Sequence, residues 1–451
     1  MKWKPYLKYK DSGVEWLGEV PGHWHVETIK QAVRFTGGGT PSKDVAAYWT
    51  GDIPWVSPKD MKVERINDAE DHITDAALRA SAASIVPIGA VLVVVRSGIL
   101  RHTIPVAIAE TPVALNQDMK ALTVRSVELE PWFLLRWIQG LQSELITHWK
   151  KQGATVESLE HEYIANTLLP VPTRPEQLQI LKFLDRETAK IDFLIAKQER
   201  LIELLQEKRQ ALIGHAVTKG LNPDAPMKSS GVEWLGDVPA HWEVTRLRRI
   251  ADGGLINGLF KTRDSYGQGA PLVNVFDVYQ SDFQIQPETL DRVHVTSAEM
   301  EKYNVLVGDL VFVRSSLKLE GIGVSAFIKE VLEPTVFECH LVRLRPRREL
   351  VVPRFLSLYL SSMSVRHRLV ASAQTTTMTT IGQEGIACLE VLLPPEQEQV
   401  QLVDYLSLET RKYDEIVAKA QRSIELMCER RTALISAAVT GKIDVREPSH
   451  A

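Results

Sequence analysis

A long segment with a coiled-coil pattern, residues 173–218, occurs a second time as residues 395–440. In both copies the seam residues follow one another at alternating steps of four and three, which is the spacing of a coiled-coil seam. Neither Gly nor Pro interrupts the first copy between Pro175 and Gly214. A helix of about 40 residues would be roughly 60 Å long and too narrow to bury its own seam. It needs a partner helix, and the second copy supplies one.

The seam has the same register in both copies, which would be accidental if these were unrelated amphipathic helices packed on separate cores. At the start of the first copy, Thr173 and Glu176 fit a capping box, and Pro175 stands where a missing N–H is tolerated. We expect the apolar seam residues to pair the two helices or to bind a partner. They are Leu184, Ile191, Ile195, Ile202, Leu205 and Leu212 in the first copy, and Leu406, Tyr413, Val417, Ile424, Met427 and Leu434 in the second.

A second repeat precedes each helix. The string SGVEWLGEVPGHW at residues 12–24 returns as SGVEWLGDVPAHW at residues 230–242, and we name these residues the GVEWLG motifs. An internal repeat of this quality means that the chain is a tandem repeat of one structural unit. The Trp residues recur at identical places, so we expect them to pack within the shared scaffold rather than to stack on bases. They are Trp16, Trp24, Trp234 and Trp242.

Between these landmarks the two copies differ. Residues 37–43 (GGGTPSK), 53–61 (IPWVSPKDM) and 116–120 (NQDMK) have no visible counterpart strings in the second copy, which carries GGLING at residues 253–258. Apolar strands that end at Arg96 and Arg314 suggest a common framework. We therefore expect each unit to present the same scaffold and to read a different target.

The predicted fold class is α+β: two globular domains of mixed helix and strand, separated by two long antiparallel coiled-coil helices in a pseudo-twofold tandem repeat. The predicted limits follow the repeats. The first globular domain takes residues 1–172, its helix 173–220, the second domain 221–393, its helix 394–443 and a C-terminal tail 444–451.

Composition favours a soluble cytoplasmic protein. Hydrophobic residues make up 44% and charged residues 24% of the 451 positions, which is ordinary for a globular chain. The longest apolar run, residues 85–95, contains Pro87 and Gly89 and is shorter than a membrane span. Three widely separated cysteines, none in a CxxC pair, predict a reduced protein without a zinc site. A net charge of −4 does not exclude a local basic patch.

Two globular readers related by a pseudo-twofold axis suit a duplex with two half-sites, and their different interiors would make that site asymmetric. The repeated GVEWLG motifs, the GGTPSK and IPWVSPKDM strings and the AVT strings near both helix ends closely resemble the DNA-specificity subunits of type I restriction-modification systems. The resemblance covers essentially the whole chain. It implies two target-recognition domains that read a bipartite, asymmetric double-stranded DNA site and direct methylation and cleavage by other subunits.

The resemblance also implies partners. Two methyltransferase (modification) subunits, which use S-adenosylmethionine, would dock on the helices, and restriction (translocase/endonuclease) subunits would complete the endonuclease. The chain itself would bind no cofactor or metal and would catalyse nothing. In agreement, Gly321 and Gly323 lack the third glycine of a dinucleotide motif, and residues 37–43 lack the Gly-Lys-Ser/Thr order of a phosphate-binding loop. Two other interpretations stay open: a coiled-coil scaffold with two protein-binding heads and, with less support, an enzyme that acts alone.

Candidate DNA contacts are polar or basic residues in Gly/Pro-rich segments and at strand ends, because Arg and Lys suit phosphates and guanine and Asn suits adenine. For any one of them a solvated surface position is the competing interpretation. The first-domain candidates are Lys43, Ser57, Lys59, Arg96 and Arg101; the second-domain candidates are Asn257, Lys261, Arg263, Arg314, Ser316 and Lys318.

Overall fold

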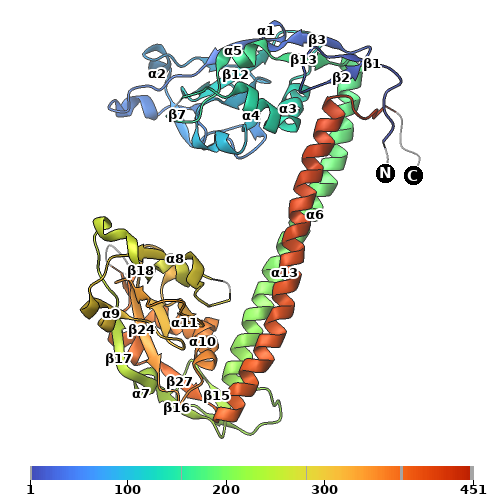
Figure 1. The fold of residues 1–451 in the computed structure, drawn as a ribbon. Coiled ribbons are helices and arrows are strands. Elements are labelled where there is room, and N and C mark those ends of the chain that lie inside the picture. The colour runs from blue at the N-terminus through green and yellow to red at the C-terminus, as the bar shows by residue number, and fades with distance from the viewer. Residues whose placement is uncertain (1–2, 154, 281, 376–378, 447–451) are drawn as a thin grey trace. The chain divides into compact units, whose positions relative to one another are not determined.

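The computed structural model describes residues 3–153, 155–280, 282–375 and 379–446 (Figure 1). Contacts divide the chain into two units. The first comprises Met1–Gln198 with Arg422–Ala451, and the second comprises Glu199–Gln421. Each unit therefore contains one globular domain and a part of both long helices.

The globular domain of the first unit is built on two sheets. One has the strand order β4-β12-β9-β10-β6 and the other β7-β5-β11-β8. The central strand β9 is buried along its whole length, which explains why its sequence is continuously apolar instead of alternating. Helix α3 begins with Pro131 and packs Phe133, Trp137 and Ile138 into the core next to β9 and β10.

The elements of this domain, in chain order, are β1 (Tyr9–Asp11), β2 (Glu19–Pro21), β3 (His25–Thr28), α1 (Ile29–Ala32), β4 (Val33–Gly37), β5 (Ile53–Val56), β6 (Arg65–Ile66), β7 (Asp71–Ile73), α2 (Asp75–Arg79), β8 (Ile85–Val86), β9 (Val91–Val94), β10 (Val106–Ala109), β11 (Val113–Leu115), β12 (Met119–Val124), α3 (Pro131–Gly140), α4 (Gln142–Trp149), α5 (His161–Asn166) and β13 (Leu168–Val171).

The globular domain of the second unit repeats this plan. Its sheets have the orders β17-β24-β20-β22 and β19-β18-β23. Strand β20 is buried like β9, and α10 begins with Pro353 as α3 begins with Pro131. Each GVEWLG motif leads into a strand that pairs with the strand just before a long helix, β3 with β13 and β16 with β27.

The elements of this second domain are β14 (Met227–Ser229), β15 (Asp237–Pro239), β16 (Glu243–Arg246), α7 (Leu247–Ile250), β17 (Ala251–Asn257), β18 (Tyr266–Val273), α8 (Val275–Val278), β19 (Asp291–Val293), α9 (Ser297–Tyr303), β20 (Leu310–Val313), β21 (Ser315–Ser316), β22 (Ser325–Phe327), β23 (Val336–Phe337), β24 (Leu341–Pro346), α10 (Pro353–Ser361), α11 (Met363–Ala371), β25 (Gln374–Thr375), β26 (Thr379–Thr380), α12 (Gln383–Ala387) and β27 (Glu390–Leu393).

The two long helices are α6 (Arg174–Lys219) and α13 (Glu396–Val439), and they run side by side (Figure 1). In the first unit, Asp192 pairs with Arg431 at 2.9 Å, and Arg446, just beyond α13, lies 3.9 Å from Glu176 at the start of α6. The start of one helix therefore meets the end of the other, so the pairing is antiparallel.

The second unit shows the same direction by its own contacts. Arg209 of α6 pairs with Asp414 of α13 at 3.2 Å. Gly220 follows α6 with a φ of +77°, and a Cβ built on it would stand 3.3 Å from Glu398 in the first turn of α13. The predicted fold of two α+β domains with antiparallel coiled-coil helices is confirmed.

The seam follows the predicted register. Leu184 and Leu406 are fully buried, and all other seam positions are buried or half-buried. Near the globular domains the neighbours Phe183, Ile213 and Ile435 are buried as well. Whether a partner protein also uses these residues stays a prediction, as do the limits of the domains. No helix in the described part of the chain is both long enough and apolar enough to cross a membrane.

Candidate nucleic-acid interface

Each globular domain has a pair of parallel strands whose ends carry polar loops. In the first domain β5 lies parallel to β11, and the N–H of Asn116 donates to the carbonyl of Val56 at 3.0 Å. In the second domain β18 lies parallel to β23, and the N–H of Glu338 donates to the carbonyl of Val273 at 3.1 Å. Residues 116–118 and residues 338–340 therefore occupy the same place, and we name them the edge loops.

The turn beside each edge loop is also shared. The N–H and the hydroxyl of Ser57 donate to Asp60 Oδ2 at 2.8 and 2.9 Å. In the second domain the N–H of Asn274 donates to Asp277 Oδ2 at 2.8 Å. Burial raises the pKa of the Asp277 carboxyl, and nearby Asp291 and Glu338 add to the rise against the lowering effect of the Asn274 N–H.

Residues within the 53–61 and 116–120 segments thus have structural counterparts in the second domain, although their sequence strings do not recur there. Val56 to Met61 reads VSPKDM and its counterpart, residues 273–278, reads VNVFDV, so only Val and Asp are kept. In each turn one aspartate accepts the hydrogen bond from the first backbone N–H and so holds the turn in place. The other side chains of the turn are therefore free to vary. Sequence comparison alone could not align them.

A close backbone crossing marks the same place in both domains. A Cβ on Gly38 would stand 1.9 Å from the carbonyl oxygen of Asn116, and a Cβ on Gly258 would stand 2.1 Å from that of Glu338. Only glycine permits this approach. The strand that ends at each glycine, β4 or β17, is thereby fixed against the edge loop.

The strand on the other side of the edge loop corrects an expectation. The N–H of Val95 donates to Asp118 O at 2.8 Å, and the N–H of Arg314 donates to His340 O at 2.9 Å. Met119 pairs with Val94 just as Leu341 pairs with Val313. Arg314 therefore takes the place of Val95 and not of Arg96. Because side chains alternate along a strand, the two arginines do not share an orientation.

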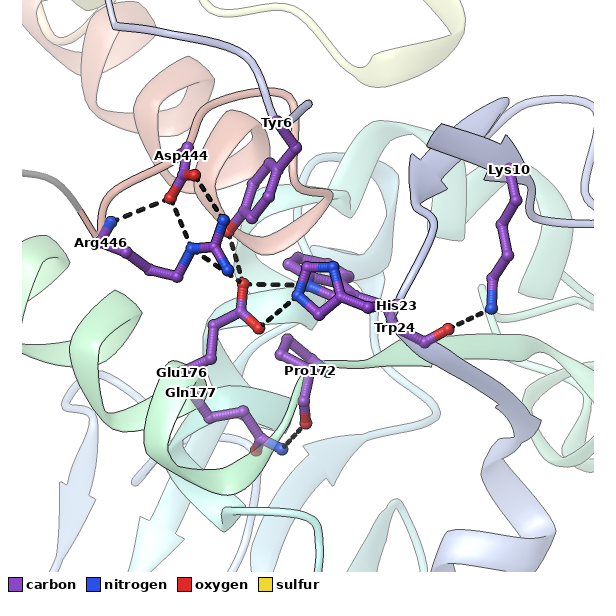
Figure 2. Close-up of polar contacts among 9 residues, drawn as sticks. All are labelled: Tyr6, Lys10, His23, Trp24, Pro172, Glu176, Gln177, Asp444 and Arg446. Atoms are coloured by element: carbon purple, nitrogen blue, oxygen red, sulfur yellow. Dashed lines mark hydrogen bonds and ion pairs between the residues drawn. The ribbon is translucent and has the colours of Figure 1, made fainter. Parts of the chain in front are cut away.

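A second cluster, repeated in both domains, joins a GVEWLG motif to a long helix, and Figure 2 shows its first copy. Glu176 is 4% exposed; its Oε1 accepts hydrogen bonds from the Tyr6 hydroxyl at 2.8 Å and from Trp24 Nε1 at 3.1 Å, and its Oε2 lies 2.9 Å from His23 Nε2. Burial, reinforced by Glu176, raises the pKa of Tyr6. Glu176, expected to close a capping box with Thr173, instead uses both oxygens on the GVEWLG motif and Tyr6.

The second domain contains the same cluster with fewer partners. Glu398 Oε2 lies 2.7 Å from His241 Nε2 and accepts from Trp242 Nε1 at 3.0 Å. The buried Trp24 and Trp242 and the half-buried Trp16 and Trp234 confirm that these side chains pack within the scaffold.

The residue after each glutamate locks the helix to its domain. Gln177 Nε2 donates to Pro172 O at 2.8 Å and its Oε1 accepts from Glu130 N–H at 2.8 Å. Gln399 repeats both bonds, to Pro394 O at 2.9 Å and from Val352 N–H at 2.7 Å. Sequence patterns did not single out Gln177 and Gln399. A signal was nevertheless present, because Glu-Gln stands at the same place near the start of both long helices.

Comparison with known proteins shows where this repeated plan occurs. Residues 21–204 match a family described as the type I restriction modification DNA specificity domain. The EcoR124I/EcoR124II specificity subunit of Escherichia coli is 35% identical over 205 residues, which cover 45% of this chain and 48% of that subunit, about half its length. The MjaIX specificity subunit of Methanocaldococcus jannaschii is 24% identical over 461 aligned positions, which cover 99% of this chain and 98% of that subunit.

Residues 21–204 are thus similar to the DNA specificity domain of type I restriction enzymes, and the chain as a whole is similar to specificity subunits. A solved structure on complex assembly and conformational transition of the type I R-M system contains a chain with the same fold, with a TM-score of 0.66 and 15% identity over 94% of this chain and 99% of that one. Most of the first globular domain lies within the matched residues and the second repeats its plan, so we name the two globular domains the recognition domains.

In the first recognition domain, most predicted contacts are neutralised within the domain. Lys59 pairs with Asp71 at 2.9 Å and Glu70 at 3.2 Å, and the hydrogen bond to Asp71 raises the pKa of the Lys59 ammonium. Arg96 pairs with Asp118 of the edge loop at 2.5 Å. Lys59 and Arg96 are therefore both paired with carboxylates of their own domain.

The remaining first-domain candidates lie differently. Arg101 is 3.4 Å from Glu157, which also pairs with Lys150 at 2.7 Å. Lys43 is exposed, whereas Ser57 is buried, with its hydroxyl bonded to Asp60. A DNA contact by Ser57 would have to break this turn.

The second recognition domain separates its candidates into two places. Lys261 pairs with Glu299 at 2.9 Å at the start of α9, where the Thr296 N–H and Lys261 together lower the pKa of Glu299 to about 2. This ion pair occupies the Lys261 ammonium within the domain. Ser316 Oγ accepts from the Lys318 N–H at 3.1 Å, and Lys318 is exposed. The side chain of Arg263 lies outside the described residues.

Asn257 and Arg314 lie beside the second edge loop. Asn257 Oδ1 and Arg314 Nε are buried and have no hydrogen-bond partner within the described part of the chain. Leaving such an atom unpaired costs about 1–3 kcal/mol. The recognition domain therefore carries two unsatisfied polar groups at a place where its counterpart has none of this kind.

The second edge loop also brings one possible ligand atom each of Glu338, Cys339 and His340 within 4.8 Å of one another. A metal site is disfavoured by the surroundings. Burial and the Glu338 charge raise the pKa of the Cys339 thiol, so the thiolate ligand is scarce, and the Arg314 cation lies close by. Glu338 Oε1 already accepts from the Val275 N–H at 2.9 Å.

Proposed function

We propose that this chain is a specificity subunit of a type I restriction-modification system and binds double-stranded DNA at a bipartite, asymmetric site, with one recognition domain on each half-site. The observation that carries the proposal is the pair of edge loops. Their backbone is fixed by equivalent hydrogen bonds and by Gly38 and Gly258, while their side chains are Asn, Gln and Asp in one and Glu, Cys and His in the other. A constant frame with variable polar side chains suits the readout of different base sequences.

We propose further that the chain catalyses nothing and directs two methyltransferase subunits, which use S-adenosylmethionine, and restriction subunits to its site in the cytoplasm. Exposed apolar residues repeat on both helices and would suit two equivalent docking contacts. Leu194 and Ile416 are 49% and 43% exposed at corresponding positions, and Leu204 and Leu426 are 39% and 49% exposed at another. Repeated exposed apolar positions favour binding of the same kind of partner twice.

The test is expression of the chain with its candidate methyltransferase in a host without DNA methylation, followed by genome-wide mapping of methylated adenines. We expect an asymmetric motif in two parts, present only when both proteins are expressed. If the two proteins assemble and methylation lacks such a motif, the proposal fails, and a coiled-coil assembly scaffold becomes the better interpretation.

A further inference from the structure

The second recognition domain has two polar groups at one end of a sheet. Asn257 ends β17 and lies opposite Val342 at the start of β24. Arg314 follows β20, whose last residue Val313 lies opposite Leu341 of the same strand. Strands β17 and β20 flank β24, so both residues lie at the same end of the sheet, next to residues 338–340.

The scaffold does not require polar side chains there. Gly37 of the first domain, which pairs with Lys120, stands where Asn257 stands, and Val95, which is 7% exposed, stands where Arg314 stands. The first domain thus folds with a glycine and a buried apolar side chain at these positions. The second domain has instead an amide and a guanidinium, each with a buried atom that nothing in the described residues satisfies.

Both side chains are only half-buried, so a rotation of each toward solvent would pair these enclosed atoms with a partner outside the domain. Buried polar groups are nearly always paired, and these two side chains are the ones that bind base edges with paired hydrogen bonds, Arg to O6 and N7 of guanine and Asn to N6 and N7 of adenine. By contrast, the edge arginine of the first domain, Arg96, is held by Asp118 at 2.5 Å.

We infer that Arg314 reads a guanine and Asn257 reads an adenine in the half-site bound by the second recognition domain. This inference rests on the proposed function and deepens it. The two domains would then differ in their readout, because the first domain has Gly37 and Val95 where the second has Asn257 and Arg314.

The test uses the full chain in complex with its methyltransferase. The Arg314→Val variant carries the first-domain residue, so the shared scaffold accommodates it. We expect one guanine of the second half-site to become degenerate in the methylation map, with discrimination there reduced about tenfold or more, and the first half-site to stay unchanged. Asn257→Gly should relax one adenine position in the same way. Arg248→Val, which removes an exposed arginine of α7, is the matched control and should leave the motif intact.

A second measurement needs no variant. Duplexes with 7-deazaguanine or 7-deazaadenine at single positions of the second half-site lack the N7 acceptor. The wild-type complex should lose affinity at one guanine and one adenine position, and at that guanine Arg314→Val should lose nothing more. A wild type without any bipartite motif would refute the proposed function. A normal wild-type motif with unaltered binding to every 7-deaza duplex would overturn the inference alone.

Discussion

The two recognition domains share the backbone structure around the edge loops but differ in how the charged side chains there are paired. In the first, edge cations are paired with carboxylates of the domain, as in Arg96 with Asp118 and Lys59 with Asp71. In the second, Phe276 stands in place of Lys59 and is 82% exposed, His340 replaces Asp118, and Arg314 keeps an unpaired nitrogen. The comparison shows that the frame depends on backbone bonds and glycines, so the chemistry of the edge can change without altering the fold.

The two junctions between a GVEWLG motif and a long helix differ in a similar way. Glu176 is 4% exposed and holds Tyr6, Trp24 and His23, whereas Glu398 holds only His241 and Trp242 among the described residues, and its side chain is 26% exposed. We expect Glu176→Ala to destabilise its junction by about 3 kcal/mol, because buried donors lose their acceptor, and Glu398→Ala to cost about 1 kcal/mol. Native-state hydrogen exchange at the Trp24 and Trp242 amides measures each junction separately.

Glu176→Gln is the control for this prediction. It keeps an oxygen acceptor and the side-chain volume, so it should recover part of the loss at the Trp24 amide. Equal losses for the two alanine variants would show that the additional partners of Glu176 contribute nothing.

The packing of each long helix on its recognition domain offers the next contrast. A Cβ on Gly140 at the end of α3 would stand 2.9 Å from the backbone nitrogen of Ser436 in α13, whereas a Cβ on Gly214 of α6 would meet only Ser362, at 4.0 Å. We expect Gly140→Ala to destabilise by about 1–3 kcal/mol, because backbone must move. Gly214→Ala should stabilise by up to about 1 kcal/mol through helix propensity.

Thermal unfolding measures whether Gly140→Ala lowers and Gly214→Ala raises the stability. Hydrogen-exchange protection along α13 and α6 shows where each change acts. Each of the two variants is the control for the other, since both substitutions add one methyl group. A neutral Gly140→Ala variant would mean that α13 shifts away at no cost.

The sequence predicted the parts of this fold that depend on periodicity and on long identical strings. The seam from Leu184 to Leu212 and the repeated Trp residues needed only spacing and repetition. The equivalence of residues 116–118 with 338–340 was hidden, because hydrogen bonds of the backbone define it and backbone bonds leave side chains free. The one-residue error at Arg314 has the same origin: both strands end near an arginine, and only the pairing of Val313 with Leu341 fixes the register.

The candidate DNA contacts stay predictions, and the structure shows how some of these side chains are paired within their domain. Residue type suggested Lys261 and Ser57, yet Lys261 is used on Glu299 and Ser57 on Asp60. Such partners come from segments distant in sequence or from local turns, and composition cannot identify them. Glu176 was assigned to a capping box because its spacing fits one, while its actual partners come from the N-terminal segment.

The helix starts of α2 and α9 differ in their response to acid. Thr74 caps α2 with Ala77 at the third position, whereas Thr296 caps α9 with Glu299, whose pKa is lowered to about 2. A lowered folded-state pKa gives stability that is present above the unfolded value of about 4.3 and is lost as the pH falls toward 2. We expect exchange protection of α9 to fall across this window and that of α2 to stay constant.

Replacing Glu299 by Gln should remove the titration while keeping the cap from Thr296. The Glu299→Gln variant would then show the same low protection of α9 at pH 5 and at pH 2.5. If α9 in the wild type kept its protection throughout, the bonds from the Thr296 N–H and Lys261 would not matter to folding.

The smallest effect is expected from the ion pairs between the helices, Asp192 with Arg431 at 2.9 Å and Asp414 with Arg209 at 3.2 Å. These pairs are partly exposed, so double-mutant cycles with Asn and Met should give about 0.2–1 kcal/mol for each.

The two arginines of these pairs should nevertheless differ in how well lysine replaces them. Arg431 also lies 3.6 Å from Glu64, whereas Arg209 lies over the ring of Phe283 at 5.4 Å. Lysine should therefore replace Arg431 with little loss, because a point charge suffices for Glu64, and should replace Arg209 less well, because a planar guanidinium stacks on the ring. Chemical denaturation of Arg431→Lys and Arg209→Lys decides this, and equal losses would show that both arginines act through charge alone.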